Sequence, residues 1–461
     1  MFDNRRLGRA MLTLLMTISP QVAVVGGGPA GLAAAIEAAR AGTTVHLYDE
    51  RPVLGGPTYA HAAQSTLIPE IHAAGPRIVL HQGATVWGVF EQRTLAVWEK
   101  ERAEKVQPEV LILAAGTHKR VVPVPGWTLP GVVDAETIRT LAPGQRVLVA
   151  GAGYQLPVVA SRILRAGGRV VGMLDAALIR RMPLALSAPW SRWALSGDAS
   201  ADWHTLRAAR VPLTGSRAVA RVIGEERVRE VVTVALDGDG RPVSDSEETI
   251  SVGAVCFVWD SVPSIQLAQI CGVEHEYAPE RGGWVPVVSA DMESSVRGLF
   301  CAGNGAGLGG AAMAVLEGRI AGIAAAARLG VLSPGQARSR LRLHQSELAP
   351  LRKSRAVLGP LHAIKPGLAE LITPDTVICP CEGVTGARVD QAHDEGVSEL
   401  GQMKRMTRAG MGECQGRLCA PALAQLIAHR RGVPLSVIPP PSFRPPVTPV
   451  PIDVLVTLAD E

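Results

Sequence analysis

The amino-acid sequence predicts an α/β protein with two dinucleotide-binding, Rossmann-like domains and a small cysteine-bearing domain near the C-terminal end. Glycine-rich turns at residues 26–31 and 151–153 each follow an apolar strand and open a helix, which is the local pattern of a dinucleotide-binding unit. Four of the 7 cysteines lie within residues 379–419. A chain of 461 residues is long enough for several domains with buried cores.

The composition excludes several classes of protein. Lys and Arg total 46 against 42 Asp and Glu, and no long basic run is present, which argues against nucleic-acid binding. Apolar stretches such as residues 311–327 are interrupted by charge, at Glu317 and Arg319, so we expect no membrane span. An odd number of cysteines does not suit a secreted disulfide framework. We therefore expect a cytoplasmic protein, or one held peripherally at the inner membrane face.

The first 20 residues predict a tail. Basic residues precede a short apolar patch at residues 10–16, but no small-residue cleavage site follows, so a signal peptide is the weaker interpretation. Met16 is an alternative start to Met1.

The first glycine turn, after the strand at residues 22–25, predicts a diphosphate site. Gly26 permits a tight turn, Gly28 lets the backbone approach a pyrophosphate, and Gly31 lets helix and strand pack closely. The helix N-terminus that follows favours an anion. Asp49 ends the next strand and is placed to bind ribose hydroxyls. The candidate residues also include Pro29, Ala30 and, as a substitute for Asp49, Glu50; the alternative is an incidental glycine turn.

Two further segments lie at residues 113–117 and 298–310. Together with the first glycine turn, they resemble the three FAD-contact segments of flavoproteins that have two dinucleotide-binding domains. These are the flavoproteins of the pyridine-nucleotide-disulfide-reductase type. The resemblance favours FAD over NAD. It implies further contacts from Gly56, Ala115, Gly116, Gly303, Asn304 and Gly310. The sequence departs from the family in two places: Asn304 stands where Asp is usual, and Pro57 where Gln commonly follows the glycine pair.

The second glycine turn is incomplete. Gly151 and Gly153 are present, but Leu156 occupies the third glycine position, and Asp175 ends the following strand. We expect the fold without a working NAD(P) site, a bound NAD(P)H being the alternative. Residues 217–259 predict an antiparallel excursion with a hairpin turn.

The four clustered cysteines predict an iron–sulfur site. Cys379, Cys381, Cys414 and Cys419 have the spacing C-x-C, thirty-two residues, C-x₄-C, with glycines beside them whose N–H groups could bond to sulfur. Zinc fits C-x-C less well, and two disulfides do not suit the cysteine usage, but both stay open as alternatives. Lys404, Arg408 and Arg417 would offset the charge of a cluster, or are simply solvated.

The cysteine run resembles a bacterioferritin-associated-ferredoxin-like [2Fe-2S] domain. The cysteine run follows an FAD-binding unit that also contains the loop at residues 123–132. In this arrangement the chain resembles the FAD-containing alpha-type subunits of heteromeric bacterial dye-linked dehydrogenases. Examples are the subunits of nopaline and octopine oxidases, hydrogen cyanide synthase and hydroxyproline dehydrogenase. This resemblance implies FAD and a [2Fe-2S] cluster as cofactors. It also implies a catalytic FAD-containing beta-type partner, a quinone or carrier as electron acceptor, and a small ferredoxin-like gamma subunit.

The expected function is electron relay within a dehydrogenase of an amino-acid-like secondary amine, of the opine or proline/hydroxyproline type. The alternatives are an NAD(P)H-dependent flavoprotein reductase, a hydrogen cyanide synthase subunit, and a mainly structural subunit. We assign no catalytic residue. His46 is expected to pack within its strand, and four other histidines are candidate flavin neighbours: His61, His72, His81 and His118.

The expected domain boundaries follow these motifs: a tail at 1–20, an FAD-binding domain at 21–145 and 256–330, a degenerate NAD-type domain at 146–255, a helical bridge at 331–375, the [2Fe-2S] domain at 376–432, and a Pro-rich tail at 433–461. Residues 439–451 should be extended chain lying on the surface without packing. This segment is a candidate contact for a partner protein. The Trp-bearing patch at 189–193 is either another such contact or part of the protein core.

Overall fold

A computed structural model describes residues 18–56, 60–153, 155–177 and 199–459. Its largest unit contains a five-stranded parallel sheet in the order β20-β7-β1-β2-β3. The central strand β1 has four apolar residues, all buried, which is typical of a strand covered on both faces. The bounds are β1 Val22–Val25, β2 Val45–Asp49, β3 Ile78–Gln82, β7 Val110–Leu113 and β20 Leu299–Cys301.

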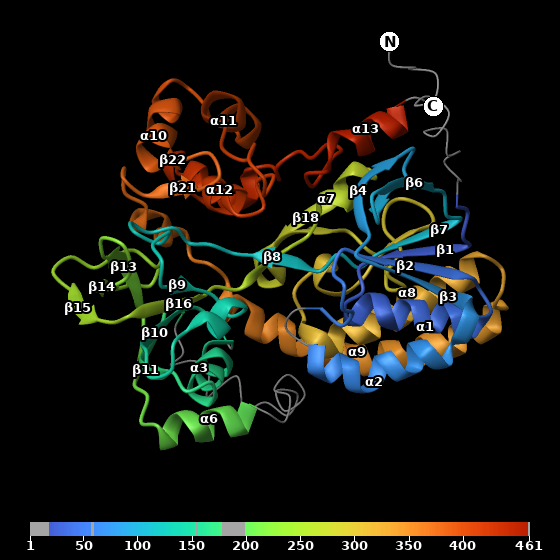
Figure 1. Ribbon diagram of the computed structural model, residues 1–461, viewed down its shortest axis with the longest axis horizontal. Helices are drawn as coiled ribbons and strands as arrows, with labels where there is room; N and C mark the ends of the chain where they lie inside the picture. Colours follow the sequence, from blue (N-terminus) through green and yellow to red (C-terminus); the bar gives the residue numbers. More distant parts are fainter. Residues whose placement is uncertain (1–17, 57–59, 154, 178–198, 460–461) are drawn as a thin grey trace, which may run out of the picture.

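Small residues bring two helices close together beneath this sheet. Helix α1 (Pro29–Ala41) packs against α8 (Gly310–Arg328), as Figure 1 shows. A Cβ atom on Gly318 would lie 2.1 Å from the Ala30 carbonyl oxygen, so the backbones touch where only glycine fits. Helix α8 has the length and composition of a membrane span, but 61% of its apolar 18-residue window is buried inside the protein.

The remaining elements of this unit surround the sheet. A three-stranded antiparallel sheet and a pair of short hairpin strands lie beside it, and a long helix, α9, follows α8 along the chain. Helix α9 begins at a capping box formed by Ser333 and Gln336. The bounds are α2 Ala60–Ala73, β4 Thr85–Phe90, β5 Thr94–Glu99, β6 Arg102–Val106, α7 Gln266–Ile270, β18 His275–Ala278, β19 Gly283–Pro286 and α9 Pro334–His362.

The second unit contains another five-stranded parallel sheet, in the order β12-β11-β10-β16-β9. The expected antiparallel excursion is present as β13–β15, but the prediction is wrong for residues 254–258, which form β16 in the parallel sheet. The bounds are β9 Val132–Val133, β10 Arg146–Gly151, α3 Gln155–Arg165, β11 Arg169–Asp175, α6 Ala199–Ala208, β12 Leu213–Gly215, β13 Arg217–Ile223, β14 Glu230–Ala235, β15 Glu248–Ser251 and β16 Ala254–Val258.

A two-stranded link joins the two units, formed by β8 (Thr117–Lys119) and β17 (Ser261–Pro263). The chain leaves the first sheet along β8 and returns along β17, so residues on these strands lie next to the first glycine turn. The predicted division of the chain into a first and second unit remains our proposal, with the second unit extending through β16.

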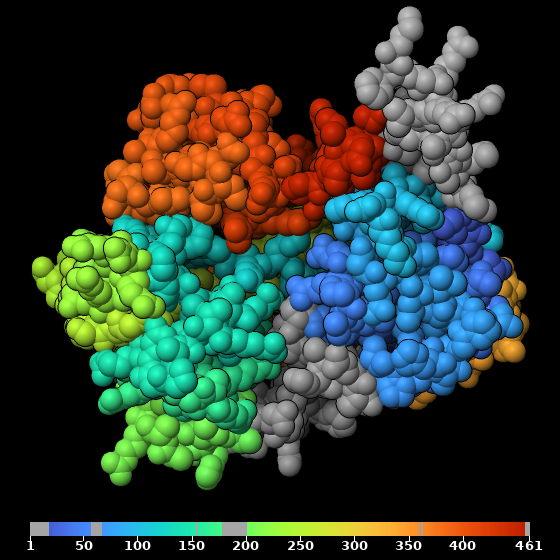
Figure 2. Space-filling model, in the orientation of Figure 1, coloured from blue at the N-terminus to red at the C-terminus, as the bar shows by residue number. Residues whose placement is uncertain are grey.

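The cysteine-bearing domain has its own apolar core and lies above the second unit in Figure 1. Its elements are β21 Val377–Cys379, β22 Val384–Thr385, α10 Gly386–Asp394, α11 Leu400–Thr407 and α12 Cys419–Arg430. In Figure 2 the orange and red C-terminal residues form a continuous cover across the top of the molecule.

The Pro-rich segment at residues 439–451 is extended chain without helix or strand, as expected, but it packs against the protein, so the expectation that it is unpacked is wrong. Val447 is 4% exposed, and its N–H donates a hydrogen bond of 2.8 Å to the carbonyl of Trp87 on β4. A final helix, α13 (Ile452–Ala459), then packs against β6. Proline removes the N–H groups that would otherwise need partners, while the few apolar residues between the prolines supply the packing.

Candidate functional site

A cavity of ≈ 440 Å³ lies at the carboxyl ends of the strands of the first sheet. Ten of the thirteen cofactor residues expected from the sequence line it: Gly26, Gly28, Pro29, Ala30, Asp49, Glu50, Gly56, Ala115, Gly116 and Asn304. The carboxyl edge of such a sheet is where nucleotides bind in folds of this kind. The cavity is therefore the candidate dinucleotide site.

The other three expected residues, Gly31, Gly303 and Gly310, do not line the cavity but shape its walls. A Cβ atom on Gly31 would lie 1.7 Å from the Gly26 carbonyl oxygen. Gly303 has φ +73°, and a Cβ there would lie 2.5 Å from the Cβ of Ala30. At Gly310 a Cβ would meet no atom within 4 Å, but the residue has φ +79°. Close packing therefore explains Gly31 and Gly303, and the backbone conformation explains Gly310.

The turn before α1 presents free backbone donors to the cavity. Gly28 is the N-cap of α1, and no side chain caps the helix, so the N–H groups of the first turn have no side-chain acceptor. A Cβ on Gly28 would meet no atom within 4 Å. Open space in front of an uncapped helix N-terminus fits a diphosphate.

Asp49 is held by the turn that it faces. One carboxylate oxygen accepts a short hydrogen bond from the N–H of Gly27, and the other accepts from Arg51 N–H at 2.7 Å. Burial raises the pKa of Asp49, which these backbone donors oppose. Each carboxylate oxygen can accept more than one hydrogen bond, so capacity for ribose hydroxyls remains. Glu50 is exposed at the rim of the same cavity.

Asn304 caps the start of α8 from within the cavity wall. Its Oδ1 accepts hydrogen bonds of 3.2 Å from the N–H groups of both Gly309 and Gly310. Two N–H donors fix the orientation of the amide, so Nδ2 is left as a donor. Behind the loop, the buried Glu317 accepts from Gly303 N–H at 3.1 Å. The departure from the usual Asp thus keeps the acceptor and replaces a negative charge by a donor.

Of the histidines expected near a flavin, only His118 is among the residues described as lining the cavity. Its Nε2 lies 2.7 Å from Ser264 Oγ and 3.1 Å from Gln266 Oε1. Burial lowers the pKa of His118 to about 4, so the ring is neutral at physiological pH. Ser264 and Gln266 were missed from the sequence, because no local pattern marks residues 146 and 148 positions further along the chain as its partners.

The remaining histidines are elsewhere. His46 and His81 contact each other at 3.0 Å, and His81 bonds Glu99 at 2.7 Å, between the first sheet and β5. His72 is exposed, and the side chain of His61 is outside the described part, as is the Trp-bearing patch at 189–193.

The four clustered cysteines come together as two pairs of thiols. Cys379 hydrogen-bonds Cys419, and Cys381 hydrogen-bonds Cys414. None of the four forms a disulfide; Cys379 and Cys419 are buried and Cys381 is exposed. The pKa of Cys379 is lowered to about 6 by the hydrogen bond from Cys419, against burial and with help from backbone N–H groups. Over the described ranges, no three His, Cys, Asp or Glu side chains converge on one metal ion.

The cysteine domain closes the nucleotide cavity. Cys414, Arg417 and Leu418 line it, together with Val447 and Thr448 of the Pro-rich segment. The sequence predicted both sites but not that they share a wall. Of the cations expected to offset a cluster's charge, Arg408 is exposed and paired with Glu382 at 2.8 Å, whereas Arg417 faces the cavity.

The second glycine turn leads into packed core. Leu156 is 0% exposed and lies in a hydrophobic cluster with neighbouring strands. Asp175 is also fully buried; its Oδ1 accepts from Ala177 N–H at 2.9 Å, and burial raises its pKa to about 7. An apolar side chain at the third glycine position is consistent with a structural role for this domain.

Comparison with known proteins agrees with this geometry. Residues 20–330 match the pyridine nucleotide-disulphide oxidoreductase family, and residues 374–458 match the sarcosine oxidase A3 domain. The predicted fold of the two dinucleotide-binding domains is thereby confirmed. The second match does not identify a ferredoxin-type domain, so that part of the fold stays a prediction.

Curated relatives extend over nearly the whole chain. The HcnB component of hydrogen cyanide synthase from Pseudomonas aeruginosa is 32% identical, over 86% of this chain and 90% of that protein. An opine oxidase component from Rhizobium meliloti is 29% identical, over 93% of this chain and 86% of that protein. Among solved structures, L-proline dehydrogenase from P. horikoshii has a TM-score of 0.69 at 21% identity, covering 95% of this chain and 80% of that chain. This last similarity is one of fold.

Proposed function

The chain belongs to the pyridine nucleotide-disulphide oxidoreductase family, in the group of HcnB and its opine oxidase counterparts, and from that premise we propose that it relays electrons within a heteromeric dehydrogenase. The family makes it an FAD-dependent oxidoreductase subunit. The proposed donor is an amino-acid-like secondary amine of the opine or proline/hydroxyproline type, oxidised on a partner subunit.

The observation that carries the proposal is that the cysteine domain forms part of the wall of the nucleotide cavity. Cys414 lines the same cavity as the first glycine turn and Asn304, although it comes from a separate domain with its own core. Because Cys414 is one of the four proposed cluster ligands, a cluster there would lie against the dinucleotide site. Adjacent redox sites within one chain are what an electron relay requires.

The residues of the cavity fit FAD. The uncapped N-terminus of α1 can hold the diphosphate, and Asp49 and Glu50 can hold ribose hydroxyls. Asn304, whose Nδ2 is left as a donor, lines the same space. FAD, when bound, supplies an acceptor that takes two electrons and releases them singly. The neutral His118 and its partners Ser264 and Gln266 can donate hydrogen bonds to the flavin ring of FAD.

The cysteine spacing supports a [2Fe-2S] cluster over zinc. A binuclear cluster takes two protein thiolates per iron, so two thiol pairs suit it, whereas structural zinc usually takes C-x₂₋₄-C at both ends, which C-x-C fits less well. Disulfides are the third alternative. The three other cysteines, Cys256, Cys271 and Cys301, are buried in the apolar cores of the two larger units and not in the cysteine domain, so they are not candidate ligands.

The cavity lining favours a division of labour between subunits. The described residues there include one histidine, His118, and its depressed pKa makes it a weak base; the carboxylates Asp49 and Glu50 are assigned to the ribose. Substrate oxidation is therefore assigned to a catalytic FAD-containing beta-type partner. A quinone or carrier and a small ferredoxin-like gamma subunit complete the proposed complex, in the cytoplasm or at the inner membrane face.

A hydrogen cyanide synthase subunit is the second candidate, because HcnB is 32% identical over most of both chains. An NAD(P)H-dependent reductase is less favoured, since Leu156 fills the place of the third glycine in the second domain. A mainly structural subunit would need a cavity that binds no cofactor.

The test is an anaerobic absorption spectrum of the purified chain, with flavin, iron, zinc and sulfide quantified on the same sample. We expect about one flavin and two irons per chain, and no bleaching of the flavin by NADH. Cys379→Ser should lose the iron, while the matched control Cys271→Ala, at a buried thiol outside the cluster, should keep it. Zinc without iron, or dye reduction with a substrate by the isolated chain, would contradict the proposal.

A further inference from the structure

A second, smaller pocket lies directly beside the nucleotide cavity. Its volume is ≈ 80 Å³, and it is formed where the β17–β19 region meets α12 and the Pro-rich segment. His118, Gln266 and Arg417 line both spaces, so these side chains form the partition between them. An engineered cavity of about 150 Å³ holds benzene, so this pocket suits a ligand of a few heavy atoms.

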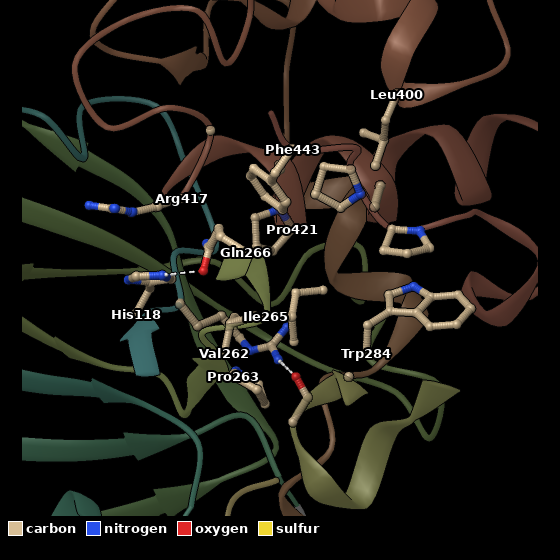
Figure 3. A pocket seen from close by; sticks show the side chains of 18 of the residues that line it. His118, Val262, Pro263, Ile265, Gln266, Trp284, Leu400, Arg417, Pro421 and Phe443 are labelled. Atoms are coloured by element: carbon tan, nitrogen blue, oxygen red, sulfur yellow. Dashed lines mark hydrogen bonds between the residues drawn. The ribbon is translucent and has the colours of Figure 1, made fainter. Parts of the chain in front are cut away.

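The pocket has one polar side and a large apolar surface. Figure 3 shows His118, Gln266 and Arg417 on one side and Trp284 on the other. Apolar side chains from the C-terminal part and from the β17 region complete the lining: Leu400, Pro421, Phe443, Val262 and Ile265. An apolar lining with a few placed polar groups is the usual form of a small-molecule site.

The charges of the lining are all of one sign. Arg120 and Arg417 line the pocket, His118 is neutral, and no Asp or Glu is among the described lining residues. The Nε atom of each arginine is buried and has no hydrogen-bond partner. Arg120 donates through Nη2 to the Gly282 carbonyl at 2.7 Å. The lining therefore contains two guanidinium groups whose hydrogen-bonding capacity the protein does not fill, and a carboxylate satisfies such a group best.

The negative charge of Asp260 favours the charged form of Arg120 and so opposes the lowering of its pKa by burial. Its carboxylate accepts from Ser261 N–H at 2.9 Å, and it does not line the pocket. Asp260 stabilises the buried guanidinium without occupying its unused Nε donor.

Gln266 adds a neutral donor to the polar side. It is 6% exposed, and its Oε1 accepts from Ser264 Oγ at 3.1 Å, so its Nε2 group is left to donate. A neutral amide donor suits a carbonyl oxygen. The described lining has no Asp or Glu to pair with an ammonium group and carries two arginines, so a further positive charge in this apolar pocket is unfavourable.

We propose that this pocket binds a small 2-oxo acid: its carboxylate at Arg120, its keto oxygen toward Gln266, and its alkyl group among Trp284 and Ile265. The corresponding amino acid is excluded by its ammonium group. This inference goes beyond the electron-relay proposal and does not depend on which cofactor fills the neighbouring cavity. Because His118 and Gln266 line both spaces, a ligand bound in this pocket would contact side chains that also line the nucleotide cavity.

Isothermal titration of the full-length chain in low-chloride buffer tests the proposal with three ligands of similar size. Pyruvate should bind, whereas methyl pyruvate, without the negative charge, and alanine, with an ammonium group, should bind at least about tenfold more weakly. Equal binding of pyruvate and alanine would overturn the assignment, and so would the absence of pyruvate binding.

Two variants locate the site. Arg120→Gln should weaken pyruvate binding by about tenfold or more. Ala424→Phe keeps both arginines but fills the pocket, and should abolish binding. The control Arg207→Gln, on the distant helix α6, should bind as the unmodified chain does. If Arg120→Gln does not fold, Ala424→Phe alone decides the question: unchanged pyruvate binding in that variant would place the ligand elsewhere.

Discussion

Arg417 donates a hydrogen bond from Nη2 to the carbonyl oxygen of Val447 at 3.1 Å and so ties the cysteine-bearing loop to the Pro-rich segment. Both residues line the nucleotide cavity. Val447 is in turn bonded to Trp87 on β4, so one chain of contacts runs from the cysteine domain to the first unit.

Removing this tie should loosen the nucleotide site. In Arg417→Ala we expect flavin to be retained about tenfold less tightly, because a hydrogen bond from a charged donor is lost from the cavity wall. Flavin released on ultrafiltration measures this. Arg430→Ala is the matched control, since it breaks a surface pair with Asp390 in the same domain. Equal flavin loss in both variants would show that the tie does not matter.

The side-chain oxygen of Asn304, which accepts two backbone hydrogen bonds, should be needed for stability. Asn304→Ala leaves the N–H groups of Gly309 and Gly310 without a partner, and should lower the free energy of unfolding by about 1–2 kcal/mol. Asn304→Asp keeps the acceptor and places a negative charge at the start of α8, so its stability should match the unmodified chain. Thermal denaturation of the three proteins measures the difference. An Asp variant as unstable as the Ala variant would contradict this account.

Two glycines of the first turn should fail in different ways. Gly28 has φ −75° and open space in front of it, so Gly28→Ala should fold normally but bind less flavin, because the new methyl group enters the diphosphate site. Gly31→Ala should lose stability as well, since its Cβ would collide with the Gly26 carbonyl. Melting temperature and flavin content, measured together, separate the two effects. A normal melting temperature for Gly31→Ala would argue against the close approach.

The buried Asp175 should make stability depend on pH. Its pKa is about 7 in the folded chain against 3.8 as its ordinary value, because burial disfavours the carboxylate more than the N–H groups of Ala177 and Gly153 and the charge of Lys365 favour it. Between these values the folded state holds a proton that the unfolded state has released. Stability therefore falls as pH rises from about 4 to about 7.

Asp175→Asn removes this effect while keeping the oxygen that accepts from Ala177. We expect the variant to gain stability over the unmodified chain as pH rises through that window, and the difference to level off above about pH 7. Thermal melts at a series of pH values check this. Parallel curves for the two proteins would show that Asp175 does not titrate on unfolding.

The sequence by itself determined the local features of this protein. The glycine turn, the following helix and the acid at Asp49 could be predicted because their spacing reflects the geometry of a single strand–turn–helix–strand unit. The gathering of four cysteines in one small domain could be predicted from their spacing in the same way, but not which cysteine lies beside which. Ten of thirteen expected cofactor residues accordingly line the cavity.

Only the tertiary structure decided what lies across the cavity from these features. Asn304, Cys414 and Val447 share one space, but their proximity comes from packing between domains, for which no local pattern exists. The same holds for Leu156, whose burial in the second core depends on neighbouring strands, and for the packed Pro-rich segment. Local spacing specifies backbone geometry over one turn or strand, whereas contacts across hundreds of residues depend on the shape of every surface that meets.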